Sequence, residues 1–279
     1  MFRNSPCKHI FALALLLAMC LTVFSGCKPK EAAEETPTTP VKINENYLDE
    51  IRDKGKLVVG VKTDVPELSY YDKETGEWSG LEVELAYNIG CDLFGVNRSD
   101  LGDKVKLVGV TVANREEKLA NGDIDLMLAT YTKTSERAKK FALSDTYYTS
   151  YIGLMVRYTP EDLNSLGTKN IKSLADLDGK LVGVAKNSTT RHDMIEYINT
   201  ANQLKVSPRF ASYSSYNALY NALKKGEIDV IAVDVSILNG YDDASTKILP
   251  DRFAGQHYGA AVLPENAKLL DVVNKVIGG

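Results

Sequence analysis

The chain has 279 residues, of which 33 are Lys or Arg and 37 are Asp or Glu, giving a formal net charge of −4 at pH 7. A chain with this balance, and without a basic run interleaved with aromatic residues, is not expected to bind nucleic acid. The three histidines, His9, His192 and His257, have no partner at metal-ligand spacing, so neither a metal site nor a cofactor is predicted.

The N-terminal residues have the pattern of an export signal. Arg3 and Lys8 precede a mostly apolar run over residues 10–24, and a Ser-Gly-Cys sequence ending at Cys27 follows. The run is shorter than the roughly 20 apolar residues that a spanning helix needs, and small residues before a Cys resemble a bacterial lipobox. We therefore predict a lipoprotein signal peptide over 1–26. Cys27 would be the lipidated first residue of an exported protein, held by its acyl chains at the outer face of the cell membrane or in the periplasm.

Residues 27–43 are predicted to form a disordered tether. They combine glutamates, alanines, threonines and prolines, a composition that cannot bury enough apolar surface to fold. Cys7 and Cys20 would leave with the signal peptide and Cys27 would be acylated, so no disulfide framework is expected. Cys91 is expected to be a small buried residue of a helix.

The following residues alternate short apolar runs with helical patterns. Runs rich in Val and Ile predict strands buried on both faces. Apolar residues at helical spacing predict helices, and the helix over 81–94 is expected to place Leu81, Leu85, Ile89 and Leu93 on one face. In chain order the first half predicts a short helix ending at Gly55, strand 57–61, a turn at 72–76, helix 81–94, strand 105–110, helix 115–120 and strand 124–128.

The second half repeats this pattern. The sequence Asn-Gly-Asp-Ile-Asp-Leu at 121–126 is echoed by Lys-Gly-Glu-Ile-Asp-Val at 225–230. The further elements expected are a helical turn at 171–177, strand 180–185, helix 191–198, helix 216–225 and a strand ending at 234. Because strands alternate with helices, parallel β-α-β units are predicted.

Two extended apolar runs, 151–156 and 258–263, are interpreted as crossings between two lobes. The predicted fold class is α/β, with a mixed or parallel sheet flanked by helices in each lobe and two crossover hinges that let the lobes close on a ligand. The first lobe is expected over 44–152, the second over 153–257, and 258–279 would return to the first. The chain ends abruptly for a terminal helix, at Gly279, and its C-terminus is predicted to be truncated.

Polar side chains follow both of the repeated strands. The first strand leads into hydroxyl residues and Arg137, and the second ends at Asp234. The carboxyl ends of strands are where open α/β sheets bind small ligands. One lobe offering a cation and the other an anion suits a zwitterion, and amino acids are the commonest small zwitterions.

Three motifs together resemble a known family. The sequence Gly-Leu-Glu-Val-Glu-Leu at 80–85 continues with Ile89 and Leu93, Thr-Lys-Thr-Ser-Glu-Arg occupies 132–137, and Phe-Ala-Leu-Ser-Asp-Thr-Tyr-Tyr occupies 141–148, with Thr146 where the family usually has Pro. The chain is similar to the bacterial solute-binding proteins of ATP-driven polar amino-acid importers. The resemblance implies a type II periplasmic-binding-protein fold, no enzymatic activity, a membrane permease as partner and a monomeric state.

The resemblance also assigns roles at the two ends of an amino acid. It implies that Arg137 holds the α-carboxylate through paired charge-assisted hydrogen bonds, with Thr189 and Ser188 as further donors. It implies that Asp234 accepts from the ammonium. Thr132 and the backbone at Thr130 would assist Asp234.

Arg115 is expected to contact the ligand side chain. Lys62 would supply a second positive charge there and Tyr216 a hydroxyl group. Members that bind glutamate or aspartate look similar here, so an acidic ligand is favoured, with glutamine or cysteine next. Arg115 could equally form an ion pair with Glu116 or Asp123. The alternative from another class is a cyclohexadienyl or arogenate dehydratase on the same fold, which would need a general acid over the leaving hydroxyl.

Overall fold

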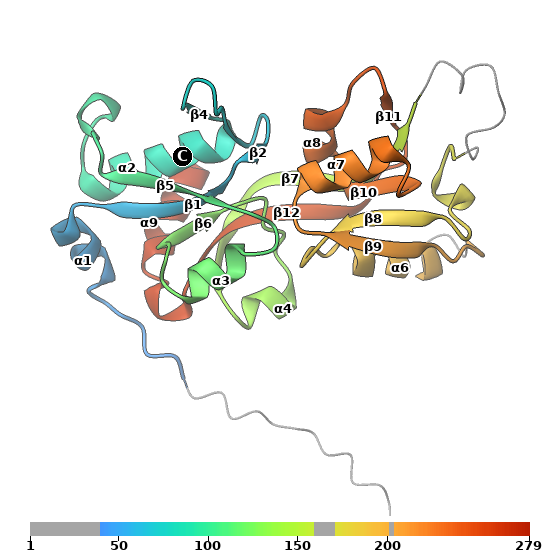
Figure 1. The fold of residues 1–279 in the computed structure, drawn as a ribbon. Coiled ribbons are helices and arrows are strands. Elements are labelled where there is room, and N and C mark those ends of the chain that lie inside the picture. The colour runs from blue at the N-terminus through green and yellow to red at the C-terminus, as the bar shows by residue number, and fades with distance from the viewer. Residues whose placement is uncertain (1–39, 159–170, 201–203) are drawn as a thin grey trace, which may run out of the picture. The chain divides into compact units, whose positions relative to one another are not determined.

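The computed structural model describes residues 40–158, 171–200 and 204–279. Val41–Gly279 form one compact unit, drawn as a ribbon in Figure 1. The predicted signal peptide over 1–26, Cys27 and almost all of the tether lie outside the described residues. Among the helices that the structure does describe, none is long and apolar enough to cross a membrane.

Helices and strands alternate along the described chain. The α-helices are α1 Tyr47–Lys54, α2 Leu81–Phe94, α3 Arg115–Ala120, α4 Ser135–Ala138, α6 Thr190–Thr200, α7 Tyr216–Lys225, α8 Val235–Leu238 and α9 Leu269–Gly278. The strands of the large sheet are β1 Leu57–Lys62, β5 Val105–Val110, β6 Leu126–Leu128, β7 Ala142–Arg157, β8 Leu181–Ala185, β9 Arg209–Tyr213, β10 Val230–Asp234, β11 Thr246–Ile248 and β12 Phe253–Val262. A small antiparallel sheet consists of β2 Asp64–Val65, β3 Ser69–Tyr71 and β4 Trp78–Ser79.

The large sheet confirms the predicted α/β class. Its order is β5-β1-β6-β12-β7-β10-β8-β9, with β11 beside β7. At one end β1 is parallel to both β5 and β6, and at the other β8 is parallel to both β9 and β10. The long strands β7 and β12 run antiparallel to each other between these two parts (Figure 1). The exact boundaries of the two lobes stay a prediction.

The repeated sequence has the same structural task in both halves. Asp125 accepts a hydrogen bond of 2.8 Å from the backbone N–H of Val58 at the start of β1. Asp229 accepts one of 2.9 Å from the N–H of Leu181 at the start of β8. Because these aspartates bind the neighbouring strand, β6 and β10 begin only after them, and β6 starts two residues later than the sequence predicts.

The two predicted crossings are parts of longer strands. The first lies inside β7, where Ala142 to Ile152 pair with β12 and Ile152 to Val156 pair with β10. The second is the C-terminal part of β12. The earlier half of β7 carries polar residues and an irregular burial pattern, so no continuous apolar run marks it.

The face predicted for α2 is partly wrong. Leu81 is 43% exposed, whereas Glu82 is completely buried. The helix begins after Gly80, whose φ of 114° is a conformation that glycine adopts readily, and its first turn directs Glu82 inward. Cys91 lies in α2 as predicted, but it is half-buried and packs against the core rather than inside it.

Each half of the large sheet has its own apolar core. In the first, α2 and α9 contribute Ile89, Leu93 and Val273 to a cluster with β1. In the second, α6 contributes Met194 and Ile198 to a cluster with β8 and β10. Full burial of one such side chain is worth about 1.5–3 kcal/mol, so both halves provide a rigid support for the loops at their strand ends.

Candidate functional site

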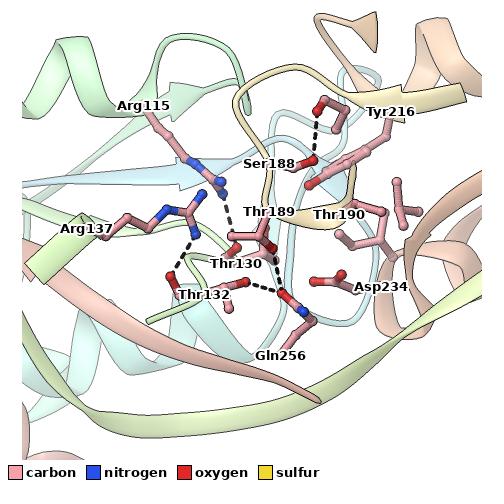
Figure 2. A pocket seen from close by; sticks show the side chains of 13 residues that line it. Arg115, Thr130, Thr132, Arg137, Ser188, Thr189, Thr190, Tyr216, Asp234 and Gln256 are labelled. Carbon is pink, nitrogen blue, oxygen red and sulfur yellow. Dashed lines mark hydrogen bonds between the residues drawn. The ribbon is translucent and has the colours of Figure 1, made fainter. Parts of the chain in front are cut away.

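A cavity lies where the segments after β6 and β10 meet the start of α6. Its free volume is about 10 Å³, and about 270 Å³ when the gaps between the lining side chains and the adjoining solvent are included. Figure 2 shows the 13 side chains that line it. Eight of the predicted site residues are among them: Arg115, Thr130, Thr132, Arg137, Ser188, Thr189, Tyr216 and Asp234.

Arg137 is held in place by backbone carbonyls and an aromatic ring. Its Nη1 donates to the carbonyl of Thr132 at 2.7 Å and its Nη2 to that of Asn187 at 3.2 Å, and its guanidinium lies 4.0 Å from the centre of the Tyr131 ring. Burial, with the nearby charge of Arg115, lowers the pKa of Arg137 to about 10. The side chain is therefore charged at neutral pH, and part of its hydrogen-bonding fork already belongs to the protein.

Thr130 adopts a strained backbone conformation two residues after the end of β6. Its φ of 47° lies in the left-handed region, which non-glycine residues rarely occupy. Its N–H donates to Glu82 Oε1 at 2.6 Å. Glu82 also accepts from the hydroxyls of Ser69 and Tyr147, and burial raises the pKa of this carboxyl group. The three donors explain how Glu82 fixes the sharp bend that brings the next residues into the cavity.

Arg115 uses only part of its donor capacity. Its Nη1 donates to the carbonyls of Ala129 at 2.5 Å and Thr130 at 3.1 Å. Its Nε and the Thr130 hydroxyl are buried without a hydrogen-bond partner. Arg115 does not form the alternative ion pairs, since Glu116 lies 3.8 Å from Arg137 Nε and Asp123 lies 4.0 Å from the ammonium of Lys118.

Asp234 is the carboxylate that lines the cavity. It is only 7% exposed, and it accepts a hydrogen bond from the Tyr258 hydroxyl. Burial raises the pKa of Asp234 to about 6, although the Tyr258 bond and the two arginines act in the opposite direction. Tyr258 also lies 3.1 Å from the hydroxyl of Ser236. The sequence analysis missed Tyr258, because its run was interpreted only as a crossing.

Lys62 does not line the cavity. Its side chain is completely buried, its Nζ contacts Asp64 Oδ1 at 2.6 Å, and it lies 4.8 Å from the centre of the Tyr216 ring. Burial lowers the pKa of Lys62. The structure thus places this predicted second cation behind Tyr216, in an ion pair with Asp64.

The start of α6 supplies more polar groups than the sequence analysis named. Ser188 donates its hydroxyl to the carbonyl of Ala185 at 2.8 Å, and the Thr189 hydroxyl donates to Gln256 at 3.0 Å. Thr190, 3% exposed, and Gln256, 2% exposed, also line the cavity and were not predicted. Thr190 directly follows the predicted residues Ser188 and Thr189, so its place in the sequence could have indicated it. The sequence around Gln256 contains no pattern that predicts a site residue.

Positively and negatively charged side chains line the cavity at separate positions. Within the described residues, no group of three or more His, Cys, Asp or Glu could hold a metal ion. Arg115 and Arg137 lie on one side in Figure 2 and Asp234 on the other. Such an arrangement is complementary to a small molecule that has both an anionic and a cationic group.

Comparison with known proteins identifies a family and several relatives of this chain. Residues 57–200 match the family model of the bacterial extracellular solute-binding proteins, family 3. The chain is 28% identical to a glutamine-binding protein of Geobacillus stearothermophilus over 93% of this chain and 94% of the relative. It is 30% identical to the ABC transporter glutamine-binding protein GlnH of Bacillus subtilis (strain 168) over 96% of this chain and 90% of the relative.

A solved structure shows the same fold. An ancestral arginine-binding protein bound to glutamine matches with a TM-score of 0.65 and 28% identity, over 80% of this chain and 91% of that one. Together with the type II periplasmic-binding-protein architecture of its structural neighbours, these matches identify the chain. It belongs to family 3 of the bacterial extracellular solute-binding proteins.

Proposed function

We propose that this protein is the substrate-binding component of an ABC importer for an α-amino acid with a polar side chain, glutamate ahead of glutamine. The observation that carries the proposal is the pair of buried, oppositely charged side chains that line one cavity, Arg137 and Asp234. The similarity to amino-acid-binding proteins of ABC transporters supports it.

The two ends of the ligand are assigned by charge. The α-carboxylate faces Arg137, which has N–H groups beyond the two that bind backbone carbonyls, and the N-terminus of α6 at Thr190 adds backbone donors. The ammonium faces Asp234. Thr132 lies in the same lining, so its oxygen can accept from the ammonium.

The acidic preference rests on Arg115. Two arginines and one aspartate line the cavity. Among the lining residues, a zwitterion matches Arg137 and Asp234 and leaves Arg115 without a carboxylate partner, with its Nε unpartnered. Glu116, outside the lining, forms its ion pair with Arg137 and not with Arg115. A side-chain carboxylate neutralises the charge of Arg115, whereas a carboxamide only accepts the hydrogen bond. Lys62 adds little to this preference, because Asp64 already neutralises it.

The test is calorimetric titration with glutamate, aspartate, glutamine, cysteine and arginine. We expect glutamate to bind most tightly. Arg115→Met should weaken glutamate binding at least about tenfold more than glutamine binding, because only glutamate loses a charge partner. Arg98→Met, which removes a surface cation whose side chain is 48% exposed, serves as the control and should bind both ligands as the wild type does. Equal losses for glutamate and glutamine in Arg115→Met would refute the acidic preference.

Export, anchoring and assembly complete the proposal. The family is extracellular, and the lipobox-like sequence supports acylation at Cys27. We propose a monomer on the outer face of the cell membrane that passes its ligand to a membrane permease. A dehydratase would instead turn over prephenate or arogenate, so release of a product from either compound would replace the transport proposal by the enzymatic one.

A further inference from the structure

Gln256 lies between the candidate ligand cavity and an adjoining groove. It lies on β12, is 2% exposed, and lines both the candidate ligand cavity and an adjoining groove that includes Asp193 and Tyr197. Thr132 also lines both the cavity and the groove. Gln256 is therefore part of the wall between the ligand and the groove.

All hydrogen-bonding capacity of this amide is used. Its Nε2 donates to Asp193 Oδ2 at 2.9 Å and to the carbonyl of Ala254 at 3.0 Å. Its Oε1 accepts from the hydroxyls of Thr132 at 2.7 Å and Thr189 at 3.0 Å (Figure 2). A primary amide has two N–H donors and an oxygen with two lone pairs, so all four are satisfied.

The partners fix which way the amide faces. A carboxylate and a backbone carbonyl only accept hydrogen bonds, so the NH₂ group must face Asp193 and Ala254. The oxygen must then face the two threonines, whose hydroxyls have to donate. Each hydroxyl has a single hydrogen, and once that hydrogen points at Gln256 only lone pairs remain for a ligand.

We infer that Gln256 is a positioning residue, which fixes Thr132 and Thr189 as acceptors toward the ligand ammonium and connects the segment after β6 to α6. This inference rests on the proposed function. It changes the role expected for Thr189, which becomes an acceptor rather than a donor to the carboxylate. It also predicts that Asp193, outside the cavity lining, influences binding, because it orients the amide.

A charge exchange between two positions tests the inference. Gln256→Glu sets a carboxylate against Asp193 and should weaken binding of glutamate and glutamine about tenfold or more. Asp193→Asn leaves the amide without its orienting acceptor and should cost less, about threefold. In the double variant Gln256→Glu/Asp193→Asn the introduced carboxylate still accepts from both hydroxyls and the introduced amide donates to it. Only the bond to the Ala254 carbonyl is lost, so affinity should return to within about threefold of the wild type.

The control is Glu196→Gln, which removes an exposed carboxylate from the same helix and groove and should leave affinity unchanged. The free energy of unfolding, measured for every variant, shows whether a loss of affinity is only a loss of folded protein. Wild-type affinity in Gln256→Glu, or a double variant as weak as Gln256→Glu, would overturn the inference. A wild-type chain that binds none of the amino acids would overturn the proposed function and this inference together, and the wild-type titration alone reveals that outcome.

Discussion

Burial acts with different consequences on the two charged side chains that we assign to the ends of the ligand. The lowered pKa of Arg137, about 10, still keeps it charged at every pH at which the protein would be assayed. The raised pKa of Asp234, about 6, lies close to neutral pH. Of the two ends of the site, only the ammonium end is therefore expected to respond to mild acid.

Ligand affinity should fall as the pH is lowered through 6. Protonated Asp234 no longer attracts an ammonium group, so at pH 5 the affinity should be about tenfold below its value at neutral pH. Calorimetric titration between pH 5 and pH 8 measures this change. Asp234→Asn is the control, because its weak binding should not vary over the same range; an equally steep profile in that variant would assign the titration to another group.

The stability of the ligand-free protein should respond in the opposite sense. The pKa of Asp234 in the folded state lies above its ordinary value of 3.8, so between about pH 6 and pH 4 the folded state binds more protons than the unfolded state. The contribution of this group to the free energy of unfolding therefore increases as the pH falls through that window. If ligand binding weakens in mild acid while the free energy of unfolding rises, unfolding of the protein cannot be the cause of the weaker binding.

At the scale of the elements, the 3₁₀ turn Asn239–Tyr241 after α8 contacts β2 and the proline that follows it. The hydroxyl of Tyr241 donates to the carbonyl of Asp64 at 2.8 Å. A Cβ atom added to Gly240 would lie 2.6 Å from Pro66 Cδ, which is closer than carbon atoms approach. Gly240 is thus required for its lack of a side chain where the two segments meet.

Gly240→Ala should reduce ligand affinity without unfolding the protein. The added methyl group must push Pro66 away, and the cavity, whose lining comes from both halves, then closes less completely. We expect affinity about fivefold to twentyfold lower, equivalent to roughly 1–2 kcal/mol, measured by titration with the amino acid that the wild type binds.

Gly255→Ala is the matched control for Gly240→Ala. An added Cβ there meets nothing nearer than 3.6 Å, so binding should be unchanged. If Gly240→Ala binds like the wild type, the contact with Pro66 is not part of ligand closure.

Local pattern predicted the elements of both halves well and their connections poorly. Strands such as β1 and β8 are continuous apolar runs, and α2 and α7 end at glycines in the left-handed conformation. The first half of β7 is stabilised by pairing with β12, a contact remote in sequence that no local pattern reports. The exposed Leu81 shows the same limit, because the burial of Glu82 is decided by partners far along the chain.

For the whole molecule, the internal repeat predicted where the site would assemble. Two similar halves place their strand ends at one cavity, so residues after β6 and at the end of β10 could be named from the sequence. Residues on β12 could not, because Gln256 and Tyr258 acquire their roles only when this strand passes between the halves. The partner of Lys62 was likewise missed, although Asp64 is two residues away, because spacing alone does not show which way a side chain faces at a strand end.

Ligand binding and membrane attachment should separate along the chain. Every residue that lines the cavity belongs to the compact unit Val41–Gly279, so this unit alone should bind its amino acid within about twofold of the full chain. Cys27→Ser, which removes the proposed acylation site, should move the full chain from the membrane fraction of cells to the soluble fraction without changing its affinity. Cys91→Ser is the control, because this thiol lies in α2 and should leave membrane attachment intact. A Cys27→Ser protein that stays in the membrane fraction would show that another segment anchors it.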